Sequence, residues 1–250
     1  MYQMVFQRYE KKYLLSRAQY EALSIRLNRV LEPDQYGPYT AASLYYDTGC
    51  FDLARASARQ SRYKEKLRLR GYGTADSTAP VFLELKKKFQ GVVHKRRACL
   101  PYGEVPGFFA NRPYRRVGAD GQVFREIDGF LARHPSVSAK MFLAYDRIAL
   151  EGDGGLRVTF DTNIRFRRTG LRLDADSQGT SILESGQTLM EVKTPGAIPL
   201  WLCRALSECG AFPVSFSKYG TCCRNCLPPV CPPRNEPGRI MEDICSRLIS

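Results

Sequence analysis

The chain has 250 residues, of which 44% are hydrophobic, and this length suffices for one domain with a substantial buried core. Its 38 lysines and arginines exceed its 25 aspartates and glutamates, so a formal charge of +13 predicts polyanionic partners. No segment reaches the roughly 18 consecutive apolar residues of a membrane-spanning helix. The first residues also lack the apolar core of a secretory signal, so we expect a cytoplasmic protein.

The first part of the chain predicts a strand, a helix and two further strands. Residues 6–12 alternate with a period of two, as in a strand. A capping box beginning at Ser16 precedes apolar residues at helical spacing, which predicts a helix from 17 to 31. Residues 64–70 and 81–88 then alternate leucines with charged side chains, which indicates two more strands.

The second part continues this mixture of helices and strands. An amphipathic helix is expected over residues 123–134, where a proline follows. The alternation predicts strands over residues 145–149, 157–167 and 190–193. A helix is predicted over residues 199–210, where it begins at a proline and ends at a glycine. Helices interspersed among such strands indicate an α+β domain, for which we expect an antiparallel β-barrel tunnel with flanking helices.

The composition changes near the C-terminus, where proline and cysteine become frequent. We therefore expect a compact domain over residues 1–220 and a tail over 221–250, with a short helix at 240–249. Nine cysteines, five of them after residue 220, do not resemble a secreted disulfide framework. Cys223, Cys226 and Cys231 leave a structural zinc site open, but no second C-x-x-C pair follows, which favours reduced thiols.

The alternating strands place cations together on one face. The charged faces are Lys64, Lys66, Arg68 and Arg70; Glu84, Lys86 and Lys88; Arg157, Asp161, Arg165 and Arg167; and Glu191 and Lys193. Cations two residues apart on a strand lie about 7 Å apart and repel by about 0.6 kcal/mol in water, but by about 2.4 kcal/mol at an effective dielectric of 20. Two interpretations stay open: a half-exposed sheet in water, or an enclosed face that binds phosphate.

Other chemistries find little support in the sequence. The charged faces carry few aromatic residues besides Tyr145, so nucleic acid is not the expected ligand. His94 and His134 are the sole histidines, one in a basic run and one before a proline, which disfavours Ser-His or Cys-His catalysis. Neither a P-loop nor a dinucleotide-binding glycine motif is present.

Nine short segments in order resemble the polyphosphate polymerase domain of the vacuolar transporter chaperone complex, in the CYTH-like triphosphate tunnel metalloenzyme superfamily. They are Arg8-Tyr9-Glu10-Lys11-Lys12-Tyr13, Ser43-Leu44-Tyr45-Tyr46-Asp47-Thr48, Lys66-Leu67-Arg68-Leu69-Arg70, Phe82-Leu83-Glu84-Leu85-Lys86, Tyr145-Asp146-Arg147, Arg157-Val158-Thr159-Phe160-Asp161, Glu191-Val192-Lys193, Pro199-Leu200-Trp201 and Ser217-Lys218-Tyr219. The similarity covers residues 6–220.

The resemblance implies that ATP donates its terminal phosphoryl group to phosphate or polyphosphate, with Mn²⁺ or Mg²⁺ as cofactor. It implies catalytic roles for Lys12, Arg68, Arg70, Lys86, Arg147, Arg157 and Lys193. It implies substrate-binding roles for Glu10, Lys66, Lys95, Arg97, Ser217 and Lys218, and a metal-binding role for Glu191. Glu10 could instead simply pair with a neighbouring cation. Any membrane association would require a partner, such as a separate membrane protein, or surface electrostatics.

One departure bears on the reaction. Hydrolytic members of the superfamily typically open with E-x-E-x-K, whereas this chain has Arg8, Glu10 and Lys12 at these positions. Fewer carboxylates mean fewer metal ligands to activate water, which favours transfer between phosphates over hydrolysis. Triphosphatase activity and a non-catalytic polyphosphate-binding module remain the alternatives.

Overall fold

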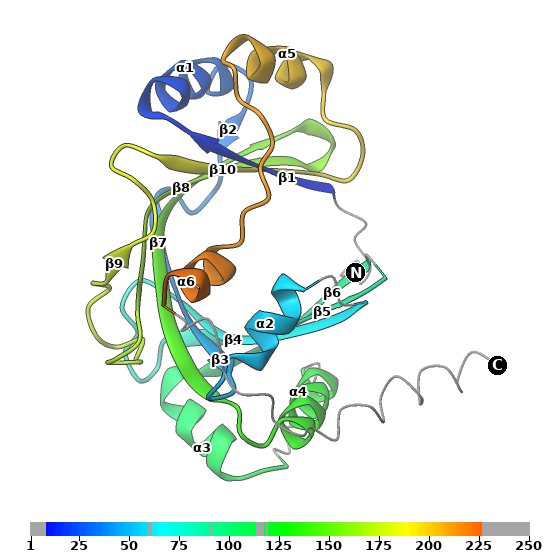
Figure 1. The fold of residues 1–250 in the computed structure, drawn as a ribbon, viewed down its shortest axis with the longest axis vertical. Coiled ribbons are helices and arrows are strands. Elements are labelled where there is room, and N and C mark those ends of the chain that lie inside the picture. The colour runs from blue at the N-terminus through cyan, green and yellow to red at the C-terminus, as the bar shows by residue number, and fades with distance from the viewer. Residues whose placement is uncertain (1–8, 60–61, 91, 114–117, 119, 227–250) are drawn as a thin grey trace, which may run out of the picture.

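The computed structural model describes residues 9–59, 62–90, 92–113, 118 and 120–226 (Figure 1). The strands are β1 (Tyr9–Leu15), β2 (Glu32–Pro33), β3 (Tyr39–Asp47), β4 (Tyr63–Tyr72), β5 (Pro80–Phe89), β6 (Val92–Pro101), β7 (Ser138–Gly152), β8 (Leu156–Arg167), β9 (Thr180–Ser181) and β10 (Thr188–Thr194). The α-helices are α1 (Arg17–Leu27), α2 (Asp52–Ala58), α3 (Val105–Ala110), α4 (Gly121–Arg133), α5 (Leu200–Glu208) and α6 (Lys218–Cys226).

All the strands join one antiparallel sheet. Its order is β1-β10-β8-β7-β3-β4-β5-β6, with β2 added to β7 and β9 added to β8. The sheet curves so strongly that β1 and β10 lie across from β4 and β5 (Figure 1). The α+β class and the antiparallel sheet are confirmed. The expected closed barrel is not formed, because β1 and β6 end the sheet and do not pair with each other within the described residues.

Two apolar layers cover the outer face of this sheet. Leucines of β4 and β5 pack with phenylalanines of α3 and α4 in one layer, and β1, β8 and β10 pack against α1 and α5 in the other. On the inner face, α2 and α6 pack against β3 and β7. Because side chains alternate along a strand, burying the leucines outward turns the charged residues of β4, β5 and β10 inward.

The expected helices are present with small differences at their ends. The capping box of α1 is confirmed, with Ser16 and Gln19 each bonding the other's backbone. This helix ends at Leu27, four residues earlier than expected, although Leu31 beyond it is still buried. Helices α4 and α5 lie within two residues of their expected bounds. The helix expected at 240–249 lies outside the described residues, as do the first residues of the N-terminal strand.

The prediction that Arg165 and Arg167 of β8 lie on the same charged face as Asp161 is wrong. The pairing of β7 with β8 shifts between Ala144 and Asp146, and Asn163 has a left-handed φ of 49°. This bulge inverts the alternation, since one extra residue moves every later side chain to the opposite face. Arg165 therefore bonds Asp146 and a neighbouring loop, and Arg167 stacks on Phe142 of the outer layer.

Helix α6 spans the expected domain boundary. Its residues Cys222 and Cys223 are buried in the inner apolar cluster, beyond residue 220. The division of the chain at that position stays a prediction. Among the described residues, no helix combines the length and the apolar character needed to cross a membrane.

Candidate functional site

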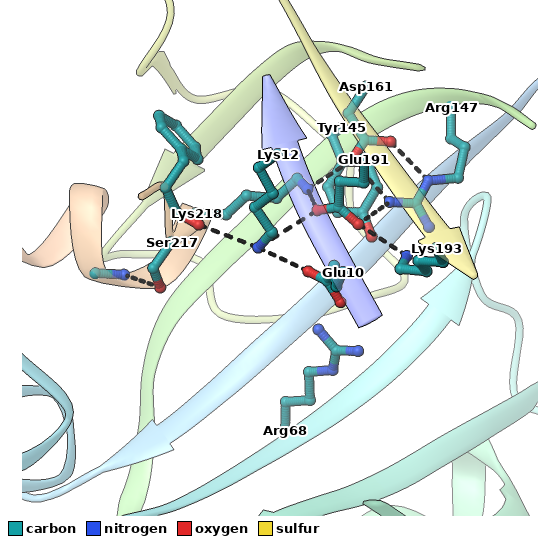
Figure 2. A network of polar contacts seen from close by, with 12 residues as sticks. Glu10, Lys12, Arg68, Tyr145, Arg147, Asp161, Glu191, Lys193, Ser217 and Lys218 are labelled. Carbon is teal, nitrogen blue, oxygen red and sulfur yellow. Dashed lines mark hydrogen bonds and ion pairs between the residues drawn. The ribbon is translucent and has the colours of Figure 1, made fainter. Parts of the chain in front are cut away.

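A buried carboxylate of β10 gathers cations from four segments of the chain. Glu191 lies 2.8 Å from Lys193 and 2.8 Å from Lys218, with Lys12 of β1 at 3.6 Å and Arg147 of β7 at 3.7 Å (Figure 2). Its side chain is only 8% exposed. Burial alone would raise the pKa of Glu191, but the charges of these cations outweigh it and hold the pKa well below its usual range.

A second carboxylate, Asp161 of β8, completes this cluster. Arg147 donates to its two oxygens at 2.6 and 2.7 Å, and Lys218 lies 2.5 Å away. Asp161 is fully buried. Burial lowers the pKa of Lys218, but Asp161 and Glu191 together raise it above its ordinary value, so the amine stays charged. The alternation of β8 had placed Asp161 on the charged face, yet nothing in the sequence marked it as the residue that orients Arg147.

The first strand brings Glu10 and Lys12 to the same cluster. Lys12 lies 3.1 Å from Glu10 and also donates to the carbonyl of Phe216 at 3.0 Å. Burial would raise the pKa of Glu10, but Lys12 and Lys193 bring it below the usual value. Glu10 therefore has a structural role as a partner of Lys12, whatever it contributes to a ligand.

A matching cluster surrounds Glu84 on the opposite part of the inner face. The carboxylate is 2% exposed and lies 2.6 Å from Arg68, 2.7 Å from Lys95 and 2.5 Å from Arg97. Burial would raise the pKa of Glu84, but these three cations depress it below its usual range. Arg68 comes from β4 and the other two cations come from β6, the two strands that pair with β5 on either side of Glu84.

Tyrosines support the arginines from beneath. Arg70 donates to the hydroxyl of Tyr145 at 2.8 Å and to that of Ser43 at 3.3 Å. The Tyr145 ring also lies 5.0 Å below Arg147. Arg68 donates to Tyr45 at 3.1 Å. Because these partners fix the guanidinium planes while leaving donors unused, the arginines are held ready for an anion.

Two lysines of the predicted site have no carboxylate partner within the described residues. Lys66 and Lys86 face each other across β4 and β5. Burial and the charge of Lys86 lower the pKa of Lys66 to about 8. Burial also lowers the pKa of Lys86. On the facing strand β1, Lys12 lowers this pKa further, whereas Glu10 opposes the shift. Uncompensated cations of this kind are stabilised when an anion enters.

The structure brings most predicted site residues into these clusters. They are Glu10, Lys12, Lys66, Arg68, Arg70, Lys86, Lys95, Arg97, Arg147, Glu191, Lys193 and Lys218. Arg157 differs, because its guanidinium bonds Asp34 at 2.7 Å and also contacts Glu151. The hydroxyl of Ser217 accepts from the backbone of Gly220 at 3.1 Å and so caps α6.

Glu191 and Asp161 are the carboxylates on the inner face that could together hold the divalent cation that the resemblance implies. Within the described residues, no three His, Cys, Asp or Glu side chains are arranged to hold a metal. Glu191 and Asp161 nevertheless meet at Lys218, at 2.8 and 2.5 Å from its amine. Magnesium is commonly held by one or two carboxylates together with substrate phosphates. These two carboxylates therefore fit a cation that is bound by the protein and by the oxygens of a phosphate chain together.

The two clusters, with the lysines and arginines beside them, bring together ten cations and four carboxylates. They are Lys12, Lys66, Arg68, Arg70, Lys86, Lys95, Arg97, Arg147, Lys193 and Lys218 against Glu10, Glu84, Asp161 and Glu191. Such an excess, from elements on both sides of a curved sheet, favours a multiply charged anion. No histidine and no activated nucleophile belongs to this set, so the arrangement suits binding and charge neutralisation of phosphoryl groups.

Comparisons with known proteins identify a family and two structures of similar fold. The model of the VTC domain family matches residues 7–226, whereas no curated protein matches the sequence. A candidate adenylyl cyclase from Hippeastrum, described as having a dominant triphosphatase activity, superimposes with a TM-score of 0.53 at 20% identity, covering 88% of this chain and 97% of its own.

A candidate adenylate cyclase from Bacillus halodurans superimposes with a TM-score of 0.50 at 13% identity, covering 84% of this chain and 95% of its own. At such identities the likeness concerns the fold alone. The family match spans all the described residues and so includes both carboxylate clusters. The chain therefore belongs to the VTC domain family.

Proposed function

We propose that this protein is a polyphosphate polymerase that transfers the terminal phosphoryl group of ATP to the end of a polyphosphate chain. The observation that carries the proposal is the inner-face network, in which Arg68, Arg147 and Lys218 are positioned by buried carboxylates and uncompensated lysines lie beside them. Membership of the VTC domain family supports the same reaction.

In this reaction the bond between the γ-phosphorus and the β-γ bridging oxygen breaks, and a terminal oxygen of the acceptor chain bonds to that phosphorus. ADP leaves, and the chain is longer by one phosphate. Phosphoryl transfer needs chiefly in-line positioning and neutralisation of charge, with little covalent chemistry from the protein. The forked donors of Arg68, Arg70 and Arg147 would orient phosphoryl oxygens, and the mobile amines of Lys86 and Lys193 would follow the charge as it moves to ADP.

Manganese or magnesium is the cofactor that this proposal includes. Glu191, with Asp161 beside it, would hold the cation jointly with phosphate oxygens. The metal, when bound, would offset charge on the phosphates and polarise their oxygens. In the free protein Lys12, Lys193 and Lys218 occupy the Glu191 oxygens. These amines can move to the entering phosphates and leave the carboxylate to the metal.

Hydrolysis of triphosphates is the second candidate, because the Hippeastrum protein of similar fold is described with that activity. The inner face favours transfer. Glu84 and Asp161 are paired with arginines, and Glu191 is assigned to the metal, so none of the three is available as a general base for an attacking water. A polyphosphate-binding module without turnover is the third candidate. The proposal places the activity in the cytoplasm, with ATP, phosphate and polyphosphate as ligands.

The ratio of products from ATP tests the proposal. A polymerase releases ADP with little free phosphate, since each transferred group enters a chain. A triphosphatase releases free phosphate in step with ADP, and a binding module releases neither. With Mn²⁺ present we expect ADP in large excess over free phosphate. Equal amounts would contradict the proposal.

A further inference from the structure

The inner face of the β4–β5–β6 region carries three successive rows of charge. In the first row Arg68, Glu84 and Arg97 lie side by side on the paired strands. The second row is Lys66, Lys86 and Lys95, and the third row is Lys64 and Lys88. Successive rows are two residues apart, so the three rows extend over about 14 Å along the strands.

The basic residues have fewer carboxylate partners in each row from the first to the third. Glu84 neutralises much of the first row and also holds Lys95 of the second. In the third row Lys88 has no carboxylate within 4 Å among the described residues, and Lys64 donates to the carbonyl of Ser57 at 2.8 Å, which is not an anion. Beside Lys88 on β6 lies Val93.

The third row is separate from the basic residues on the outer face. Leu83 and Leu85 are buried in the outer apolar layer, so Lys88, an odd number of positions from both, projects inward. Lys87 projects outward and lies 3.7 Å from Glu126 of α4. Two neighbouring lysines therefore differ in both their face and their pairing.

We propose that Lys64 and Lys88 form an outer subsite for the distal phosphates of a polyphosphate chain, an inference that rests on the proposed function. A linear polyanion that reaches the first row and extends along β4 and β5 meets the second row and then the third. Single-stranded nucleic acid is a poorer fit, because Val93 offers no aromatic surface on which a base can stack. The subsite would hold a growing chain between transfers, and so favour long products.

Binding measurements on the full chain with two ligands test this subsite. Tripolyphosphate and a long-chain polyphosphate are titrated, without metal, into the wild type, Lys88→Gln and Lys64→Gln/Lys88→Gln. One charge at about 7 Å in a water-like medium is worth about a threefold change in affinity. We expect about threefold weaker binding of the long chain to the single variant and about tenfold weaker binding to the double variant. Binding of tripolyphosphate should stay within about twofold of the wild type.

Lys87→Gln is the matched control, since it removes the same charge from the next residue but on the other face. It should leave both ligands within about twofold of the wild type. Equal losses in Lys87→Gln and Lys88→Gln would show a general charge effect and overturn the subsite. Equal losses for both ligands in Lys88→Gln would also overturn it, as would displacement of the long chain from the wild type by single-stranded RNA of matched charge. Failure of the wild type to bind either ligand would instead refute the proposed function, and the subsite with it.

Discussion

Replacing Glu191 by glutamine should destabilise the free protein while improving its binding of metal-free phosphate. The carboxylate is 8% exposed and lies within 4 Å of four cations, so its loss leaves buried positive charge without a partner. Breaking a buried ion pair typically costs 3–5 kcal/mol. Lys218 and Arg147 keep Asp161 as a partner, so we expect a loss near the low end, about 3 kcal/mol.

For a chain of this size, each kcal/mol changes the melting temperature by about 2–4 °C, so Glu191→Gln should melt about 6–12 °C lower. Phosphate then becomes a better partner for the cations that glutamine no longer neutralises. Without metal, tripolyphosphate should therefore raise the melting temperature of Glu191→Gln by more than that of the wild type. With Mn²⁺ present the order should reverse, and turnover should be lost.

Thermal unfolding with and without tripolyphosphate measures these effects, and Glu151→Gln is the matched control. Glu151 also contacts an arginine, Arg157, but its side chain is 53% exposed. An exposed pair contributes about 1 kcal/mol or less. If Glu191→Gln melts with the wild type, or if metal-free tripolyphosphate stabilises it less than the wild type, the assignment of Glu191 as the countercharge of the site is refuted.

Three further perturbations test other parts of the site. Tripolyphosphate at about 100 times its dissociation constant should stabilise the wild type by about 2.7 kcal/mol, and Arg68→Ala/Arg70→Ala should lose most of this gain in the same thermal assay; full retention would exclude both arginines from the site. The Lys66 amine has a pKa of about 8 against an ordinary 10.5, so the unfolded state binds more protons between these values and phosphate-free stability should rise with pH there. Lys66→Met should accordingly melt above the wild type at pH 7, with a difference that vanishes near pH 10.5; a pH-independent difference would show that the charge is not its cause. Ending the chain at Cys226 should preserve stability and phosphate binding, whereas ending it at Gly220 should lower the melting temperature by removing buried Cys222 and Cys223; equal melting of the two would support the composition-based boundary.

Much of the fold follows from the sequence because its strands alternate without ambiguity. Leu67, Leu69, Leu83 and Leu85 must be buried, and this requirement alone turns the charged residues between them to the other face. Helices α1 and α4 could also be predicted from the sequence, because the capping box at Ser16 and the apolar spacing of α4 are local signals.

The bulge in β8 could not be predicted from such alternation. Asn163 adopts a left-handed conformation that asparagine tolerates but does not require, and the inverted alternation after it depends on pairing with β7. The openness of the sheet is likewise a property of long-range pairing, because no local pattern states whether β1 meets β6.

The site was predictable as a set of residue types but not as a set of contacts. Strand alternation and family resemblance together named the cations, whereas the partners that position them come from distant segments. Asp161 orients Arg147 and Lys218, and Tyr145 supports Arg70. These partners are far apart in the sequence, so the alternation within one strand does not predict the contacts. Conversely, Arg157 fits the motif, yet its guanidinium is held by Asp34.

The length distribution of the products made from ATP tests the central claim most directly. The purified protein is incubated with ATP and Mn²⁺, and the products are resolved by gel electrophoresis, with Glu191→Gln and Arg68→Ala/Arg70→Ala alongside. The wild type should produce a ladder of phosphate chains longer than triphosphate together with ADP, and both variants should lose that ladder. ADP and free phosphate without any chains, or bound ATP that is never turned over, would contradict the assignment of polyphosphate polymerase activity.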